Sequence, residues 1–143
     1  MSITLSPIGR EDIKNLETAL LIETLFRKDV LEALKDPSQR ITWLTSLGIA
    51  AGALAREKAK MTIRQIAEEL GISEATVRSH LTGKTKAGQL VRETYEKFLK
   101  EGVTMKSLEI LLSKDEINNK INELENTIEE LKKKLEELKN LLK

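Results

Sequence analysis

Residues 113–143 carry a heptad repeat of large aliphatic side chains. Successive members are alternately four and three residues apart, which gives a period of 3.5 residues over more than three heptads. This pattern predicts a long α-helix whose narrow apolar seam is buried against another helix. Position a of the heptad is held by Ile121, Ile128, Leu135 and Leu142, and position d by Ile117, Leu124, Leu131 and Leu138.

The seam favours pairing between two copies of the chain. Isoleucine and then leucine at position a, with leucine at position d, is typical of a parallel two-stranded coil. In that arrangement Lys134 would face Lys139 of the second chain and repel it. We therefore expect a homodimer whose helix orientation stays open. The alternative, in which this helix packs on the N-terminal helices of its own chain, fits the narrow stripe less well.

The rest of the chain also predicts helices. Among 143 residues there are only two prolines, and runs of β-branched residues are scarce. With two Phe, one Tyr and one Trp, the core must be aliphatic. We predict an all-α protein with a helical N-terminal region at residues 1–35, a helix-turn-helix domain at 36–112 and a coiled-coil oligomerisation helix at 113–143.

Composition also excludes several kinds of site and location. The absence of cysteine excludes disulfides, thiolate metal sites and a cysteine nucleophile. The longest apolar run, residues 47–55, is far shorter than the ~20 residues that span a bilayer, and the N-terminus lacks a signal pattern. We expect a cytoplasmic protein with no membrane partner. Abundant Glu and Lys are typical of thermophiles.

Helix starts can be placed along the N-terminal part. Ser6-Pro7 predicts the start of a first helix, and Asp29 can cap a short second one. Asp36 followed by Pro37 predicts the start of a longer helix that runs to about Lys58. Residues 103–112 fit either a helix or a strand, and we favour the helix. Small residues spaced for close helix packing, within the chain rather than across a dimer, are Gly48, Ala51, Gly52 and Ala55.

Residues 62–86 have the spacing of a helix-turn-helix. Thr62 and Gln65 form a capping box that starts one helix, and Gly71 can adopt the positive φ that ends it. Ser73 then caps a second helix, and Ala67 is small enough to let it pass close by. The apolar positions that should converge on a shared core are Ile63, Ile66, Leu70, Ile72, Val77 and Leu81.

Two resemblances follow from this stretch. The segment IAEELGISEATVRSHL resembles the DNA-binding segment of LuxR-type response regulators and of sigma-factor region 4, although Gly83 ends the second helix earlier than in those families. The longer run TVRSHLTGKTKAGQLVRETYEKF resembles archaeal helix-turn-helix regulatory proteins encoded beside KaiC-like ATPases. That resemblance implies a regulatory role, with a KaiC-like ATPase as a possible partner.

The charge distribution supports contact with DNA. Residues 56–100 carry ten basic and six acidic side chains, and no acid lies between Arg78 and Arg92. A local positive patch is what a phosphate backbone attracts, although a solvated surface would show the same pattern. The interpretation is a sequence-specific dimeric transcription regulator that binds double-stranded DNA. The alternative is a protein-binding adaptor, with the ATPase as its candidate partner, in which the helix-turn-helix is architectural.

If the helix at about residues 73–82 enters the major groove, Arg78 is the best candidate to grip a guanine edge, although a phosphate contact fits it equally well. The other candidates for base edges are Glu74, Ala75, Ser79 and Thr82. The candidates for phosphate contacts are Ser73, Thr76, Lys84, Lys86, Arg92 and Arg64.

No constellation of residues predicts catalysis, a cofactor or a metal site. There is no Gly-rich phosphate loop after a strand, no ordered Ser–His–acid set and no ligand cluster. His80 is the only histidine, so a packing and hydrogen-bonding role is favoured over a pH-sensitive or metal-binding one. Trp43 and Tyr95 are expected in or near the core rather than as stacking platforms, since single-strand binding needs several aromatics.

Overall fold

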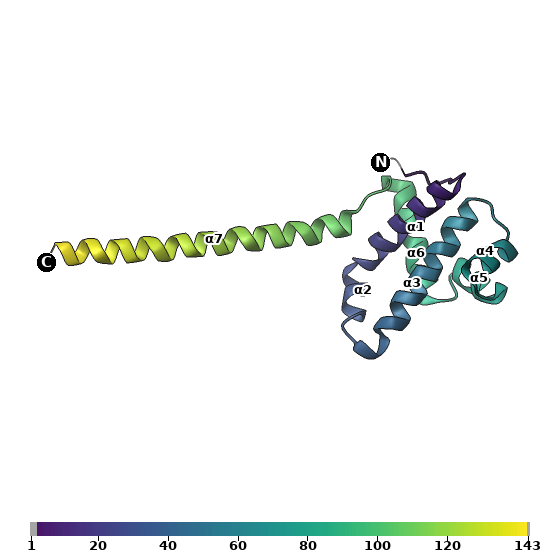
Figure 1. The fold of residues 1–143 in the computed structure, drawn as a ribbon, viewed down its shortest axis with the longest axis horizontal. Coiled ribbons are helices and arrows are strands. Elements are labelled where there is room, and N and C mark those ends of the chain that lie inside the picture. Colours follow the sequence, from purple (N-terminus) through teal and green to yellow (C-terminus); the bar gives the residue numbers. More distant parts are fainter. Residues whose placement is uncertain (1–2, 143) are drawn as a thin grey trace. The chain divides into compact units, whose positions relative to one another are not determined.

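The computed structural model describes residues 3–142, and for residues 107–112 it describes the backbone alone. The described residues form seven helices and no strand, which confirms the predicted all-α class (Figure 1). The chain divides into two compact units between Leu108 and Glu109, and each is described by itself. Residues 1–2 of the predicted N-terminal region and residue 143 of the predicted coil lie outside the described residues.

The first unit is built on three helices that pack against one another. They are α1 (Arg10–Leu25), α3 (Pro37–Lys58) and α6 (Lys86–Glu101), which Figure 1 shows side by side. The short helix α2 (Lys28–Ala33) connects α1 to α3. The regions that the sequence analysis separates at residue 35 therefore share one aliphatic core, whose buried members include Leu16, Leu20, Leu47, Leu54, Leu90 and Phe98.

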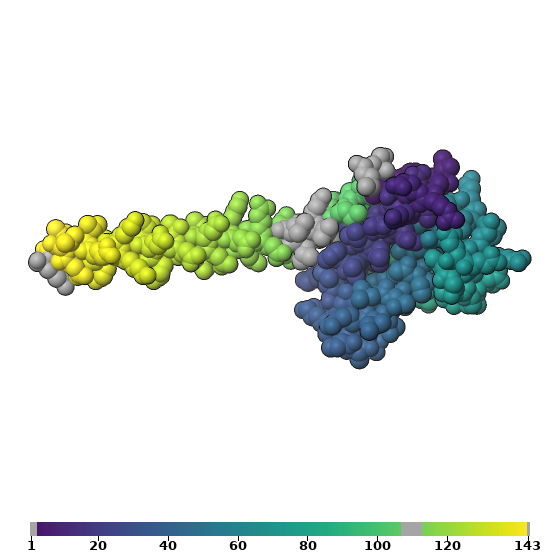
Figure 2. All heavy atoms as spheres, viewed as in Figure 1, coloured from purple at the N-terminus to yellow at the C-terminus, as the bar shows by residue number. Residues whose placement is uncertain are grey.

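Helices α4 (Ile63–Leu70) and α5 (Glu74–Leu81) add a second, smaller core. Ala53 of α3, Ile66 and Ala67 of α4 and Val77 of α5 are buried together there. Leu81 packs against both cores, so α5 is tied to the main body. In the space-filling view, the segment of α4 and α5 forms one side of the first unit (Figure 2).

Two predicted helix starts are wrong and one is confirmed. Asp36 caps α3 by accepting from the Ser38 N–H at 3.0 Å, with Pro37 in the first turn, as predicted. The first helix, however, begins at Arg10 after Gly9, not at Ser6-Pro7. The N–H of Ile8 donates to the Asp12 carboxylate at 3.3 Å, so this segment bonds to the helix from outside it.

The prediction that Asp29 caps the second helix is also wrong. The residue at the cap position is Arg27, and Asp29 lies in the first turn of α2. The Asp29 carboxylate instead accepts from the Arg27 guanidinium, at 3.1 and 3.2 Å. Burial alone would lower the pKa of Arg27, but its hydrogen bond to Glu93 and the charge of Asp29 outweigh burial and raise that pKa.

Polar contacts fix α1 against α6. Lys97 donates to the buried Glu23 at 2.9 Å, and the buried hydroxyls of Thr24 and Thr94 lie 2.6 Å apart. The Tyr95 hydroxyl donates to a backbone carbonyl of the N-terminal segment at 2.9 Å, so this ring lies at the edge of the core as predicted. Because each buried polar group finds a partner across the helix pair, these contacts help to set one register between α1 and α6.

The second unit is a single continuous helix. Helix α7 spans Lys106–Leu141, so the backbone from Lys106 onward is helical, as favoured for residues 103–112. Within residues 3–142, no helix combines the length and apolar character needed to cross a bilayer.

Candidate nucleic-acid interface

The turn between α4 and α5 forms through the capping groups that the sequence predicts. The Thr62 hydroxyl accepts from the Gln65 N–H at 3.2 Å, and the Gln65 side chain accepts from the Thr62 N–H at 2.9 Å. Gly71 has φ of +69°, a conformation that side-chain-bearing residues rarely adopt, and it ends α4. Ser73 then accepts from the Thr76 N–H at 3.1 Å and starts α5. The two helices are thus positioned by local chemistry.

Helix α5 has one buried and one exposed face. Val77 and His80 are buried against the body, whereas Glu74, Ala75 and Arg78 are exposed. Ser79, also predicted to face outward, is half-buried. The exposed face is therefore narrower than the predicted one, with Arg78 near its centre.

The hydroxyl groups at the two ends of α5 already have partners within the chain. Ser73 and Thr76 hydroxyls lie 2.8 Å apart, in addition to the cap bond between them. Thr82 is the residue after the last turn, and its hydroxyl donates to the Arg78 carbonyl at 2.7 Å. These groups are exposed or half-exposed, so each still has a lone pair or proton that a phosphate or base can meet.

Four exposed cations follow the exposed face of α5 into α6. We call Arg78, Lys84, Lys86 and Arg92 the basic set; none of them forms an ion pair with any other described residue. Arg64 differs, because its Nε lies 3.2 Å from the Glu68 carboxylate. Charges that are exposed and unpaired attract phosphates more strongly than compensated ones.

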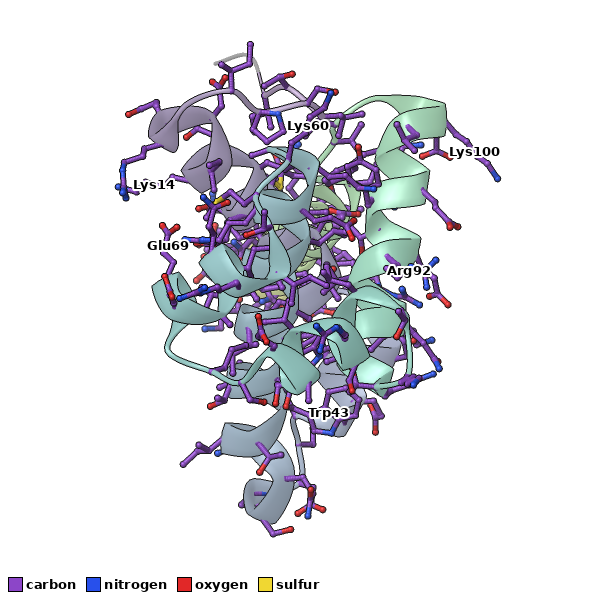
Figure 3. The ribbon with its side chains drawn as sticks, turned by 90° about the vertical axis from the view of Figure 1, so that its right-hand side faces the viewer. Lys14, Trp43, Lys60, Glu69, Arg92 and Lys100 are labelled. Carbon is purple, nitrogen blue, oxygen red and sulfur yellow. The ribbon has the colours of Figure 1, made fainter. Side chains whose placement is uncertain are left out.

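The fold brings Arg92 back beside the turn that ends α5. A Cβ atom placed on Gly83 would lie 2.9 Å from Arg92 Nη1, so the guanidinium covers this glycine. The Gln89 side chain donates to the Gly83 carbonyl at 2.9 Å and holds the same turn. Figure 3 labels Arg92 on the side of α6. Arg92, the member of the basic set most distant in sequence from Arg78, therefore lies beside the turn that ends α5.

His80 connects α5 to the start of α6. Its Nδ1 lies 2.7 Å from the Thr85 hydroxyl, which also accepts from the Gly88 N–H at 3.0 Å and caps α6. Burial lowers the pKa of His80, which favours the neutral ring. This agrees with the predicted packing and hydrogen-bonding role.

Sequence reasoning missed Gly88, although it sets the distance between α5 and α6. A Cβ atom there would lie 2.3 Å from the backbone carbonyl oxygen of His80. Only glycine permits this approach. The available signal was a glycine inside a helix, where it costs about 1 kcal/mol relative to alanine and usually has a packing reason.

The predicted coil positions are exposed in the single chain. Their exposed fractions run from 46 % for Ile121 to 88 % for Leu142. Seven of these side chains lie on α7, and Leu142 directly follows its last residue. By contrast, the aliphatic core residues of the first unit are buried.

Comparison with known proteins agrees with this geometry. A family described as winged helix-turn-helix DNA-binding matches residues 53–82, which span the end of α3, α4 and α5. The match ends one residue after α5, and the described residues beyond it form α6 and α7 and no strand. The family is defined by DNA binding rather than by a catalysed reaction.

A relative covers most of the chain. The uncharacterized protein MJ1053 of Methanocaldococcus jannaschii is 51 % identical over 119 residues, which is 80 % of this chain and 73 % of the relative. No solved structure matches the chain significantly. These findings support the helix-turn-helix and an archaeal relative, but they give no support to the LuxR resemblance or to an association with a KaiC-like ATPase.

Proposed function

Since the chain belongs to the same family as the archaeal protein MJ1053 and contains a DNA-binding helix-turn-helix, we propose that it is a sequence-specific transcription regulator that binds double-stranded DNA as a homodimer. The observation that carries this proposal is the basic set, four exposed and unpaired cations beside the exposed face of α5. A duplex offers two phosphates for each base pair along such a surface, so these cations have an evident partner.

The proposed docking places α5 in the major groove. Arg78 lies near the centre of its exposed face, where a guanidinium can grip guanine O6 and N7. Lys84, Lys86 and Arg92 follow at the end of α5 and the start of α6, where they can meet the flanking phosphates. Arg64 contributes less, because Glu68 already compensates its charge.

Dimerisation through α7 would supply the affinity that one α5 lacks. A short helix with four or five phosphate contacts binds only modestly at physiological salt, whereas two linked modules bind far more tightly. The exposed a and d side chains of α7 support this step, because each gains roughly 1.5–3 kcal/mol when fully buried. Two copies of α5 would then address half-sites about one helical turn apart.

The test is salt-dependent binding to a duplex chosen by in vitro selection. Affinity should fall steeply with salt, with a log–log slope of about −0.9 for each phosphate neutralised. Replacing both Arg78 and Lys84 by alanine should weaken binding and reduce the slope by about 0.9 for each phosphate contact of Lys84 that is lost. The matched control replaces Lys14 and Lys100 by alanine, two exposed lysines outside the basic set, and should leave both values nearly unchanged.

The protein-binding alternative predicts a different outcome. An adaptor for a partner such as a KaiC-like ATPase would show no salt-dependent affinity for any selected duplex. Unchanged duplex affinity in the Arg78→Ala, Lys84→Ala variant would reject the DNA-binding proposal and leave that alternative.

A further inference from the structure

A cavity separates the first half of α3 from the junction of α5 and α6. Its volume is about 270 Å³, close to the lower end of the ~300–1,000 Å³ typical of small-molecule sites. Trp43 forms part of the α3 wall, and Figure 3 labels it in the lower half of the view, below Arg92 and away from Lys60. The lining residues are Gln39, Thr42, Trp43 and Ser46 of α3 with His80, Thr85, Lys86 and Ala87.

The lining combines a flat apolar surface with a single charge. Trp43 and Ala87 supply apolar area, and Thr42 and Ser46 carry hydroxyl groups. Lys86 is the only charged side chain in the lining, and no carboxylate is present to neutralise it. Such a site is selective for a ligand that is flat and apolar with one negative charge, because a cationic ligand would be repelled and a neutral one would leave Lys86 unused.

His80 adds a second observation from the opposite wall. It is 7 % exposed, and its Nδ1 is already engaged with Thr85, so its ring is fixed in orientation where it lines the cavity. The cavity therefore has a rigid wall on the α5 side and an aromatic wall on the α3 side. Preformed walls of this kind lower the entropic cost of binding a small ligand.

We propose that this cavity binds a small aromatic carboxylate as an effector, with its ring against Trp43 and its carboxylate at Lys86. Lys86 also belongs to the basic set. A bound carboxylate would neutralise it and compete with a DNA phosphate for the same ammonium group. The effector would therefore weaken duplex binding; this last step rests on the proposed function, whereas ligand binding does not.

The binding test uses Trp43 as its own reporter, because it is the only tryptophan in the chain. Benzoate and 1-naphthoate are titrated into the full-length protein without DNA. The fluorescence emission of Trp43 is followed, and calorimetry is the second readout. We expect a saturable signal for the carboxylates and much weaker binding of benzamide, the neutral analogue of benzoate. Lys86→Gln should weaken benzoate binding by about tenfold, the loss expected for one charged hydrogen bond.

The control for ligand binding is Lys100→Gln, which removes an exposed lysine of the same helix away from the cavity. It should bind benzoate as the unaltered chain does. The proposal is overturned if neither carboxylate gives saturable binding at millimolar concentrations, if Lys86→Gln binds benzoate unchanged, or if benzamide binds equally well. A response of Trp43 to duplex DNA but to neither carboxylate would assign the cavity to the DNA interface and also overturn it.

The coupling is then measured with duplex. Benzoate should lower the duplex affinity of the unaltered chain and leave that of Lys86→Gln unaffected. If benzoate binds but duplex affinity does not change, the effector role is wrong while the ligand site stands. If no duplex binds at all, the failure belongs to the proposed function, and the DNA-free titration still decides the ligand site.

Discussion

Two apolar stripes on helices of this protein have opposite surroundings. On α3, the small residues Ala51, Gly52 and Ala55 are buried within the first unit. On α7, the large residues Leu124 and Ile128 are 63 % and 51 % exposed. Small side chains let neighbouring helices of the same chain approach closely, whereas a narrow stripe of large ones needs a partner helix to cover it.

The contacts around Gly52 show how the small residues of α3 pack against neighbouring helices. A Cβ atom there would lie 2.7 Å from the Glu17 carboxylate of α1 and 3.3 Å from Leu70 of α4. The close packing predicted from the spacing of the small residues is therefore confirmed at Gly52, but the prediction is wrong at Gly48, where no atom lies within 4 Å of an added Cβ atom. The large side chains of the α7 stripe are exposed, and we propose that a second copy of the chain covers them.

The largest effect is expected from charges placed in the α7 stripe. Replacing both Ile128 and Leu135 by glutamate removes two apolar layers, each residue being worth roughly 1.5–3 kcal/mol per chain when buried, and adds like charges to the seam. We expect the full-length protein to become monomeric by light scattering. The unfolding of the first unit should be unaffected.

A matched control places the same charges on the outer face of α7. Lys133→Glu with Asn140→Glu occupies f positions of the heptad, away from the seam. This variant should keep the dimer mass. A dimer that survives the Ile128 and Leu135 replacements would contradict our assignment of the seam.

A smaller effect is expected where two backbones approach in the first unit. Gly88→Ala places a methyl group 2.3 Å from the His80 carbonyl oxygen, so α5 and α6 must separate. We expect a loss of about 3 kcal/mol in the free energy of unfolding, at the upper end for overpacking. Chemical denaturation followed by circular dichroism measures it.

The same substitution at Gly48 provides the control. No atom lies within 4 Å of a Cβ placed there, and the residue is inside α3. Gly48→Ala should therefore stabilise the protein by up to about 1 kcal/mol, because alanine has the higher helix propensity. If Gly88→Ala and Gly48→Ala changed the free energy of unfolding in the same direction, the close approach at Gly88 would not limit stability.

Local sequence signals predicted much of this fold because capping is local chemistry. Thr62, Gly71 and Ser73 each act within four residues of themselves, so their roles can be read from the sequence. The contact between Gly88 and His80 could not be predicted, since it depends on how two helices cross. The wrong start at Ser6-Pro7 has the same origin in part, because the Tyr95 hydroxyl of α6 donates to the Leu5 carbonyl of that segment.

The features of the candidate interface also differ in whether the sequence could predict them. The exposure of Arg78 follows from the helical period of α5 and could be anticipated. The half-burial of Ser79 and the placement of Arg92 over Gly83 arise from the α5–α6 junction. The cavity beside Trp43 could not be predicted from the sequence either, because its two walls come from residues about forty positions apart.

A third prediction concerns the pH dependence of native stability, through the buried His80 at the junction of α5 and α6. Burial lowers the pKa of His80 below its usual 6.5, so the unfolded chain binds a proton there more readily than the native one. Native stability should therefore fall as pH drops below about 6.5, by less than ~1.4 kcal/mol per pH unit for one proton. His80→Gln, which can still bond to Thr85, should show a shallower fall between about pH 6.5 and 5.5. Identical pH profiles for the two proteins would exclude His80 as the cause.

The smallest expected effect separates the two possible orientations of the α7 pair. In a parallel coil Lys134 and Lys139 of opposite chains would repel each other, once on each side of the seam. Lys139→Glu turns each repulsion into an attraction, worth a few tenths of a kcal/mol per pair at the exposed rim. The parallel dimer should therefore dissociate a few-fold less readily in sedimentation equilibrium, with the gain disappearing at high salt because rim charges are screened. In an antiparallel coil Lys134 and Lys139 of opposite chains do not face each other across the seam. Unchanged or weaker association of the Lys139→Glu variant would therefore contradict the parallel arrangement and leave the apolar seam intact.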